Sequence, residues 1–239
     1  MKISSGIEAI NSALWFEKQK LLVVADIHLG YEEALNKQGI LVPRVQFSET
    51  LKVFKQLFNQ LKSKKIKTIV INGDLKHEFG EISQSEWHET LEILDLLAEH
   101  CEKIILIKGN HDTILGPIAK KRNLKIVDYH CFDDICILHG DKIIENKDAK
   151  KAKLLIIGHE HPAVSLREGN KIEKYKCFLL GKYKGQMLLV MPSFLPIIEG
   201  SDVKKEFLLS LYLQEDLSNF KVWILGDKVY EFGKLKNIR

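Results

Sequence analysis

Short aliphatic runs recur through the first two thirds of this 239-residue chain, and polar residues that can bind a metal ion follow each run. Nearly continuous Val, Ile and Leu is typical of strands that are covered on both faces of a parallel sheet. Ligands of open α/β sheets bind at the carboxyl ends of the strands, so parallel pairing would bring the polar residues together. The runs are 21–25 (LLVVA), 68–71 (TIVI), 103–107 (KIILI), 135–138 (ICIL) and 153–157 (KLLII).

Two helical patterns lie between these runs. Apolar residues spaced by three and four positions, as on one face of an α-helix, begin at Phe47 and at Trp87. Pro43 is expected in the first turn of the former helix. Ser83 with Glu86 resembles a capping box for the latter. The alternation of strand and helix predicts βαβ units with parallel pairing.

From about residue 172 the pattern changes to successive strands with short turns, which predicts an antiparallel second sheet. A further strand is expected at 13–16. Because no long linker separates the two parts, we expect two sheets packed face to face in a single domain over residues 1–239. The C-terminal strands are expected at 174–180, 186–191, 207–213, 221–225 and 228–232.

The composition excludes several classes of protein. Hydrophobic residues make up 45% and charged residues 28%, which argues against global disorder. A net charge of +4 falls below the strongly basic balance that by itself indicates nucleic-acid binding. Lysine clusters at 62–67 and 147–153 are expected on the sheet edge away from the metals. No apolar run reaches the roughly 18 residues of a membrane span, so no membrane association is expected.

The spacing of the cysteines indicates no disulfide framework and no cysteine metal site. They form no C-x-x-C pair, and the N-terminus lacks the pattern of a signal peptide. We therefore expect reduced cysteines in a cytoplasmic protein, at Cys101, Cys131, Cys136 and Cys177.

The residues that follow the runs have the chemistry of a metal site. Imidazoles and carboxylates with one amide, and no thiolate, suit Mn²⁺, Fe or Zn²⁺ rather than a Cys-rich structural zinc site. Two ions about 3.5–4 Å apart that share a carboxylate would use the whole set. On an extended chain, residues two apart such as Asp26 and His28 point the same way. The candidate ligands are Asp26, His28, Asp74, Asn110, His139, His159 and His161.

Each motif is a weak signal when taken alone, because Asp-x-His and Gly-Asp are common in turns. Five of the nine histidines, however, directly follow the aliphatic runs. His88 and His100 fall in a predicted helix and are expected at the surface. Chance would not place metal-binding residues after five successive strands, so we interpret them as one site.

Several further residues have two interpretations each. Lys76 and His77 either approach the substrate phosphate or begin a solvated segment. Asp141 either supports a ligand histidine or is a simple loop aspartate. The segment 192–202 either forms a wall of the site or only connects two strands. Weaker candidates are Tyr31 and Arg44.

The order of the motifs D-I-H, G-D, G-N-H-D, H-G-D and G-H-E-H over residues 26–161 resembles the calcineurin-like metallophosphoesterase superfamily. The flanking segments A-D-I-H-L-G-Y-E, G-D-L-K-H-E-F and M-P-S-F-L-P-I-I-E-G-S-D-V are similar to small archaeal phosphoesterases related to the SbcD nuclease. They are also similar to bacterial DNA-ligase-associated phosphoesterases. The resemblance extends over residues 20–203.

The resemblance implies an α/β fold, a four-layer αββα sandwich of two mixed sheets. It assigns a first metal to Asp26, His28, Asp74 and His161, and a second metal to Asp74, Asn110, His139 and His159. It also implies that His111 is the catalytic histidine near the leaving group and that Asp112 orients His111. Two divalent ions are then expected, with Mn²⁺ first and Zn²⁺ or Fe as alternatives, and a hydroxide that bridges them as the nucleophile.

Three functions follow from these features. The first is a metal-dependent phosphoesterase that hydrolyses phosphodiester or phosphomonoester bonds, on nucleotide-like substrates. The second is a DNA or RNA nuclease in a repair setting, acting for example on single strands. The third is a non-catalytic scaffold that binds a partner protein, which the intact Asp74 and His111 argue against. The natural substrate and the oligomeric state depend on loop shape and surface, which motif spacing does not specify.

Overall fold

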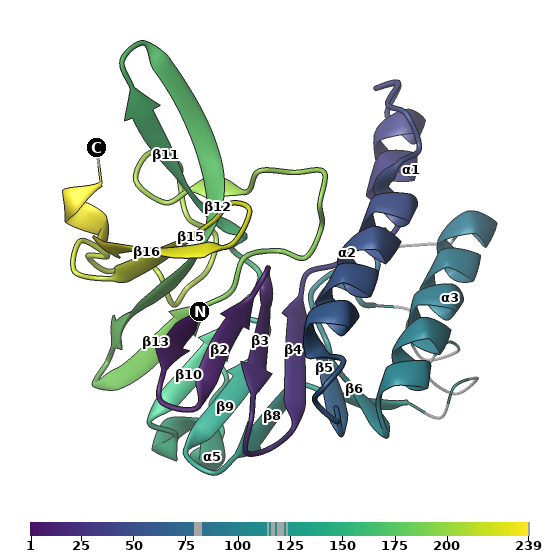
Figure 1. The fold of residues 1–239 in the computed structure, drawn as a ribbon, viewed down its shortest axis with the longest axis horizontal. Coiled ribbons are helices and arrows are strands. Elements are labelled where there is room, and N and C mark those ends of the chain that lie inside the picture. The colour runs from purple at the N-terminus through teal and green to yellow at the C-terminus, as the bar shows by residue number, and fades with distance from the viewer. Residues whose placement is uncertain (79–82, 114, 116–117, 119–121, 123, 239) are drawn as a thin grey trace.

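Two β-sheets stack face to face, and helices α2 (Gln46–Leu61) and α3 (Gln84–His100) cover the outer face of the first (Figure 1). The computed structural model describes residues 1–78, 83–113, 115, 118, 122 and 124–238. Phe79, which ends the G-D-L-K-H-E-F motif, lies outside the described residues. The two mixed sheets and their outer layers confirm the predicted α/β sandwich.

The first sheet contains seven strands in the order of the chain. Its first three strands form an antiparallel meander, and the strands from β4 to β7 run parallel. Two predicted strands have the bounds that the aliphatic runs indicate, and the 68–71 run extends by one residue. The strands are β1 (Lys2–Ser4), β2 (Ile7–Ile10), β3 (Ala13–Phe16), β4 (Leu21–Ala25), β5 (Thr68–Asn72), β6 (Lys103–Ile107) and β7 (Lys125–Val127).

The second sheet is mixed, with β9, β10 and β13 running parallel. The prediction of an antiparallel second sheet from about residue 172 was wrong, because β9 and β10 come from the first part of the chain and pair in parallel within it. Aliphatic runs identify strands but not their neighbours. The strands are β8 (Tyr129–Phe132), β9 (Ile135–Leu138), β10 (Leu154–Ile157), β11 (Pro162–Glu168), β12 (Lys171–Tyr183), β13 (Gln186–Val190), β14 (Ser201–Asp202), β15 (Lys221–Leu225) and β16 (Val229–Lys234).

Three apolar layers hold these elements together. Phe54 of α2 and Leu94 of α3 pack on the outer face of the first sheet, and Val70 and Ile156 lie in the layer between the sheets. The outer face of the second sheet is covered by the short helix α5 (Lys147–Lys151) and by an irregular segment, residues 203–220. The remaining helical elements are α1 (Tyr31–Lys37) and the 3-10 helix η1 (Leu235–Asn237).

Two local predictions were wrong. The run 207–213 forms no strand, and polar contacts to neighbouring loops hold it instead. Pro43 precedes α2 rather than lying in its first turn. The buried carboxylate of Glu32 accepts hydrogen bonds from the N–H groups of Val45 and Gln46, which satisfies the first donors of the helix and sets its start.

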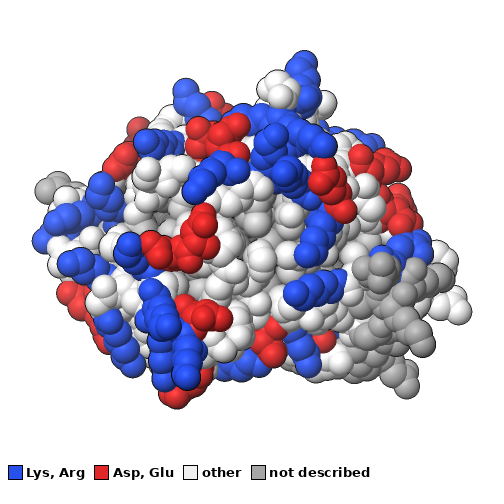
Figure 2. Space-filling view, turned by 90° about the horizontal axis from the view of Figure 1, so that it is seen from below, with Lys and Arg blue, Asp and Glu red and all other residues white. Residues whose placement is uncertain are grey.

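The lysine clusters lie at the amino ends of the strands, the lower end of the molecule in Figure 1. Seen from that side, basic side chains outnumber acidic ones, and several acidic side chains lie directly beside basic ones (Figure 2). Ion pairs join Lys64 to Glu17 at 2.6 Å and Lys153 to Asp134 at 2.7 Å. These clusters are therefore a solvated, partly neutralised surface. Every helix in the described part of the chain is too short or too polar to cross a membrane.

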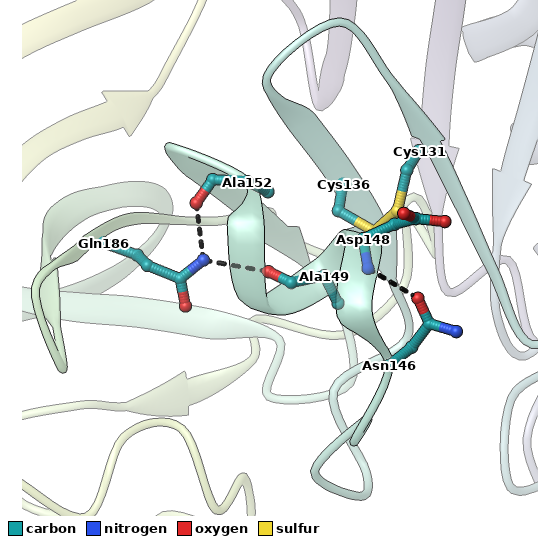
Figure 3. Close-up of a disulfide and its surroundings, with 7 residues drawn as sticks. All are labelled: Cys131, Cys136, Asn146, Asp148, Ala149, Ala152 and Gln186. Carbon is teal, nitrogen blue, oxygen red and sulfur yellow. Dashed lines mark hydrogen bonds between the residues drawn. A yellow bond between two sulfur atoms is a disulfide. The ribbon is translucent and has the colours of Figure 1, made fainter.

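A disulfide joins Cys131 of β8 to Cys136 of β9, so the prediction of four reduced cysteines was wrong (Figure 3). The two residues are directly paired across the hairpin, which brings their side chains together. Cys101 and Cys177 are free thiols. The cytoplasmic location was argued from reduced cysteines. It loses that support and stays a prediction.

The disulfide lies beside α5, which leads into β10 (Figure 3). The Asn146 side chain caps the start of α5 by accepting from the Asp148 N–H at 2.7 Å. Gln186 of β13 donates to the carbonyl of Ala149 at 2.9 Å and also to the carbonyl of Ala152. These bonds join α5 to β13, beside the β8–β9 hairpin that carries the disulfide.

The disulfide predicts the number of free thiols in solution. Protein denatured without reductant should take up two equivalents of iodoacetamide, on Cys101 and Cys177, and four after reduction. Mass spectrometry of the intact and digested protein measures both numbers. Four alkylated cysteines before reduction would contradict the pairing.

Candidate metal centre

The predicted site residues lie where the carboxyl ends of strands from both sheets meet. Strands β4, β5 and β6 are adjacent and parallel in the first sheet, and β9 and β10 are parallel in the second. Backbone bonds join neighbouring loops: the N–H of His28 donates to the Asp74 carbonyl at 2.8 Å, and that of Gly158 to the His139 carbonyl at 2.8 Å. The predicted convergence of the five loops is therefore present, although it uses two sheets.

One hydrogen bond crosses directly between the sheets. The backbone N–H of His159, after β10, donates to Oδ2 of Asp26, after β4, at 2.9 Å. The loop after β13 adds two further bonds, from Phe194 N–H to the Ala25 carbonyl at 2.7 Å and from Leu195 N–H to the Asp26 carbonyl at 3.2 Å. Asp26 is thus held from both sides before any metal is considered.

Five of the seven candidate ligands have a left-handed backbone, which is uncommon for residues other than glycine. The expectation that each D-x-H or H-x-H pair lies on extended chain was therefore wrong. Each of these five ligands lies in a sharp turn, which sets the direction of its side chain. Such conformations cost about 1–3 kcal/mol each and concentrate at functional sites. The φ angles are 55° for Asp26, 49° for His28, 41° for Asp74, 66° for His159 and 51° for His161.

Two glycines of the motifs are required by close approach. A Cβ on Gly73 would lie 1.9 Å from Nδ1 of His139, and a Cβ on Gly109 would lie 2.1 Å from Oδ1 of Asp74. Both contacts are far shorter than van der Waals distance. The G-D and G-N-H-D motifs therefore need glycine because ligand side chains pass directly over the backbone.

The candidate ligands fall into two groups. Asp26, His28 and His161 form one group and Asp74, His139 and His159 form the other, with ligand atoms within 4.8 Å of one another in each. Oδ2 of Asp74 lies 3.6 Å from Nε2 of His28 and 3.3 Å from Nε2 of His139, so Asp74 stands between the groups. Asn110 joins the second group, with Oδ1 2.9 Å from Nε2 of His139.

The donor set fits divalent cations. Oδ1 of Asp26 and Nδ1 of His139 are buried without a hydrogen-bond partner among the described residues. Nε2 atoms of His28 and His161 lie 3.2 Å apart. Buried polar atoms without partners are costly, and a cation placed among them would satisfy them. Nitrogen and oxygen donors without sulfur suit Mn²⁺, Fe or Zn²⁺.

Burial and charge set the protonation of the ligands. Burial raises the pKa of Asp26 well above its usual range, and it lowers the pKa of His161 to about 3. Burial would also lower the pKa of His139, but its bond to Asp74 and the charges of Asp26 and Asp74 raise it to about 9. His161 therefore offers a free lone pair at neutral pH, whereas His139 holds a proton that a metal must displace.

His111 and Asp112 belong to the G-N-H-D loop after β6. Asp112 is buried and accepts from the N–H of Leu75 at 3.1 Å and of Gly109 at 3.0 Å, so it fixes the loop backbone. Burial and the charge of Asp74 raise the pKa of Asp112 to about 6. The His111 N–H donates to Oδ1 of Asp74 at 2.9 Å. The ring Nδ1 of His111 contacts the carbonyl of His77.

Neither interpretation of Lys76 was right. Lys76 is fully buried, so it neither contacts solvent nor faces the cavity. Its ammonium donates to the carbonyl of His111 at 2.8 Å and to that of Glu78. Lys76 thus holds the backbone beside His111. The sequence carried no sign of this, because a lysine after a Gly-Asp turn is usually exposed.

A cavity of about 230 Å³ opens over both ligand groups. His77, with Nδ1 3.2 Å from Nδ1 of His28, faces this cavity, as does Tyr31. The 192–202 segment supplies Leu195, Ile198 and Ser201 to the wall, which supports the first of its two interpretations. The lining residues are His28, Tyr31, Asp74, His77, Asn110, His111, His159, Glu160, His161, Leu195, Ile198, Ser201 and Leu209.

Arg44, one of the weaker candidates, and Asp141 lie apart from the cavity. Arg44 is exposed and lines a separate depression beside Glu33 and Glu89. Asp141 is half-buried, and its negative charge raises the pKa of His139 and opposes the lowering of the pKa of His159. Asp141 therefore acts on the ligands through its charge.

The comparisons with known proteins agree with this geometry. Residues 19–163, more than half of the chain, match the family model described as calcineurin-like phosphoesterase. The chain belongs to the calcineurin-like phosphoesterase family. No curated protein sequence matches it closely.

One of three solved structures similar to this chain, the nuclease MPE, shares its fold at low sequence identity. The nuclease MPE of Pseudomonas putida is 18% identical, with a TM-score of 0.65 and 92% of each chain covered. A Vps29 single mutant from Entamoeba histolytica is 16% identical, with a TM-score of 0.38, over 89% of this chain and 99% of that one. A predicted phosphoesterase from Streptococcus pneumoniae is 15% identical, with a TM-score of 0.34, over 90% and 97%.

Sequence reasoning missed two residues that position the site of this phosphoesterase. Glu160 is buried between His159 and His161, and its Oε2 accepts from the N–H of Ser210 at 2.8 Å. Lys176 of β12 donates to the carbonyl of Ser193 at 3.0 Å and to that of Leu195. Glu160 could have been found from its place between two candidate ligands. Lys176 carried no signal, because nothing in the sequence pairs β12 with the 192–202 segment.

Metal binding should release a proton from His139. The pKa of about 9 lies above the value of 6.5 for a free histidine, so the metal-free protein holds this proton at pH 7.5. A coordinating imidazole must be neutral. Calorimetric titration with Mn²⁺ in two buffers of different ionisation enthalpy should show proton release that includes about one proton from His139, and this proton should weaken affinity by about tenfold per pH unit below pH 9.

The matched control for this titration is His100→Ala, which changes an exposed histidine and should leave proton release unchanged. His139→Asn should lower the release by about one proton. Release that is equal in wild type and His139→Asn would contradict the assignment.

Proposed function

We propose that this chain is a metal-dependent phosphoesterase that hydrolyses phosphodiester or phosphomonoester bonds, with nucleotide-like substrates. The observation that supports this is one arrangement: two ligand groups separated by Asp74 lie at the base of a cavity that His111 also lines. A phosphate in this cavity would meet both ligand groups and His111 at once. A non-catalytic scaffold with this fold would not need two ligand groups and a histidine at one cavity.

The proposed ligands are the seven residues predicted from the motifs. Asp26, His28 and His161 would hold one cation, and His139, His159 and Asn110 the other, with Asp74 between them. A pair of divalent cations supplies Lewis-acid chemistry, which makes water acidic enough to attack phosphorus near neutral pH and offsets charge on the phosphoryl oxygens. Mn²⁺ is the metal that we expect first, with Zn²⁺ or Fe as alternatives.

His111 is proposed as the acid for the leaving oxygen. Its Nδ1 contacts the His77 carbonyl, which can only accept, so Nδ1 carries a hydrogen. A proton given to the substrate would come from the other ring nitrogen. To give a proton to the departing oxygen, the ring must be in its doubly protonated form. Asp112 and Lys76 position His111 by holding its loop.

Activity on bis-p-nitrophenyl phosphate tests the proposal. The protein should hydrolyse this diester with Mn²⁺, Zn²⁺, Fe²⁺ or Co²⁺ and lose activity in EDTA. Asp74→Asn should lower kcat/KM by at least about 100-fold, because it weakens both cation sites. His111→Asn should lower kcat by about 10²–10⁴-fold through loss of the acid.

The control variant is His88→Ala, whose histidine is exposed on α3 and should keep full activity. Circular dichroism should show that each variant folds. A folded wild type that binds metal but turns over no phosphoester would overturn the proposal.

The second candidate is a nuclease acting on single-stranded nucleic acid. It is favoured by the likeness of fold to a protein named as a nuclease, at 18% identity. A labelled single-stranded oligonucleotide with Mn²⁺ should then be cut, and binding should weaken steeply with salt. Hydrolysis of small diesters without cutting or binding of the oligonucleotide at low salt would exclude this candidate.

A further inference from the structure

The 207–212 segment exposes every second side chain although it belongs to no strand. Phe207, Leu209 and Leu211 are 84%, 63% and 52% exposed, respectively. The alternate residues, among them Ser210 and Tyr212, point inward. This backbone therefore presents a row of apolar side chains on one side and is anchored on the other.

The anchors tie the segment to the loops that carry candidate ligands. The Ser210 N–H donates to Oε2 of Glu160 at 2.8 Å, and the Ser210 hydroxyl donates to the carbonyl of Gly140 at 2.8 Å. Glu160 separates two candidate ligands, and Gly140 directly follows a third. The Tyr212 hydroxyl adds a bond by accepting from the Ile144 N–H at 3.2 Å. The exposed row therefore has a fixed position relative to the ligands.

Only one member of the row lines the cavity. Leu209 faces it together with Leu195 and Ile198 of the 192–202 segment, whereas Leu211 lies outside the lining. Single exposed leucines are normal on protein surfaces. Leu209 and Ile198 face the same cavity as the ligand groups and the fully buried Leu195 lies behind them, so two anchored segments form a shaped apolar wall.

We propose that Leu209, Leu195 and Ile198 form a subsite for the aromatic ring of a phosphoester, such as a nucleobase or an aryl group. The proposal rests on the proposed function, because the phosphoryl group must be held by the cations. A phosphate held there leaves its organic group inside the same cavity. An aromatic ring gains most from an apolar wall, because it covers a large area without leaving polar atoms unpaired. Leu209 is then a specificity-determining residue.

Binding of two non-hydrolysable phosphonates to the Mn²⁺-loaded protein tests the subsite. Phenylphosphonate and methylphosphonate share the anionic group and differ only in the ring. Wild type should bind phenylphosphonate at least about tenfold more tightly in calorimetry. Leu209→Ser should reduce this preference to about twofold or less and leave methylphosphonate affinity unchanged. The variant should fold normally, because Leu209 is exposed.

Leu211→Ser is the matched control, since the same change two residues along lies outside the cavity and should keep the preference. Equal preference in wild type and Leu209→Ser, or equal weakening of both phosphonates, would overturn the subsite. Because neither phosphonate is hydrolysed, the result is separate from turnover. If the protein lacks phosphoesterase activity but its preference for phenylphosphonate still depends on Leu209, the result would contradict the proposed function and support the subsite.

Discussion

The burial of two carboxylates beside histidines is the constraint on which the site depends. Asp26 and Asp74 follow adjacent parallel strands, and burial, with the charge of Asp74 as a smaller contribution, raises the pKa of Asp26. His139 lies against both of them, 3.4 Å from Asp26 and 3.3 Å from Asp74. In the metal-free protein the histidine proton offsets this charge. Divalent cations would offset the negative charge of the carboxylates more completely than one histidine proton does, so this combination of carboxylates and histidines suits metal binding.

The surrounding backbone is organised around these side chains at a cost in stability. Five candidate ligands have left-handed backbone conformations. Gly73 and Gly109 have no side chains, which leaves room for His139 and Asp74 to pass over them. Cross-loop hydrogen bonds and the buried Lys76 hold the turns in place. Local strain of this kind persists only where the surroundings over-determine the structure. The two stacked sheets provide that rigidity.

The second sheet contributes both ligands and substrate-facing surface. It carries His139 and His159 to the site, and the irregular segment outside it places Leu209 at the cavity. The same run of residues, 207–213, looked like a strand because it is almost entirely apolar. Its inward partner is Glu160 instead of a neighbouring strand. The apolar composition of the run therefore did not show that Leu209 and Leu211 are exposed and that Ser210 points inward.

The sequence by itself determined the strands that the five aliphatic runs mark, the α2 and α3 helices and the family, because aliphatic runs, helical spacing and motif order are local properties of the chain. It also placed the candidate ligands next to strand ends. Only the tertiary structure decided that these strands divide between two sheets, that Cys131 pairs with Cys136, and that Lys76 is buried. Those outcomes depend on contacts between residues distant in the chain or across a hairpin, and periodicity along one strand carries no information about its neighbour.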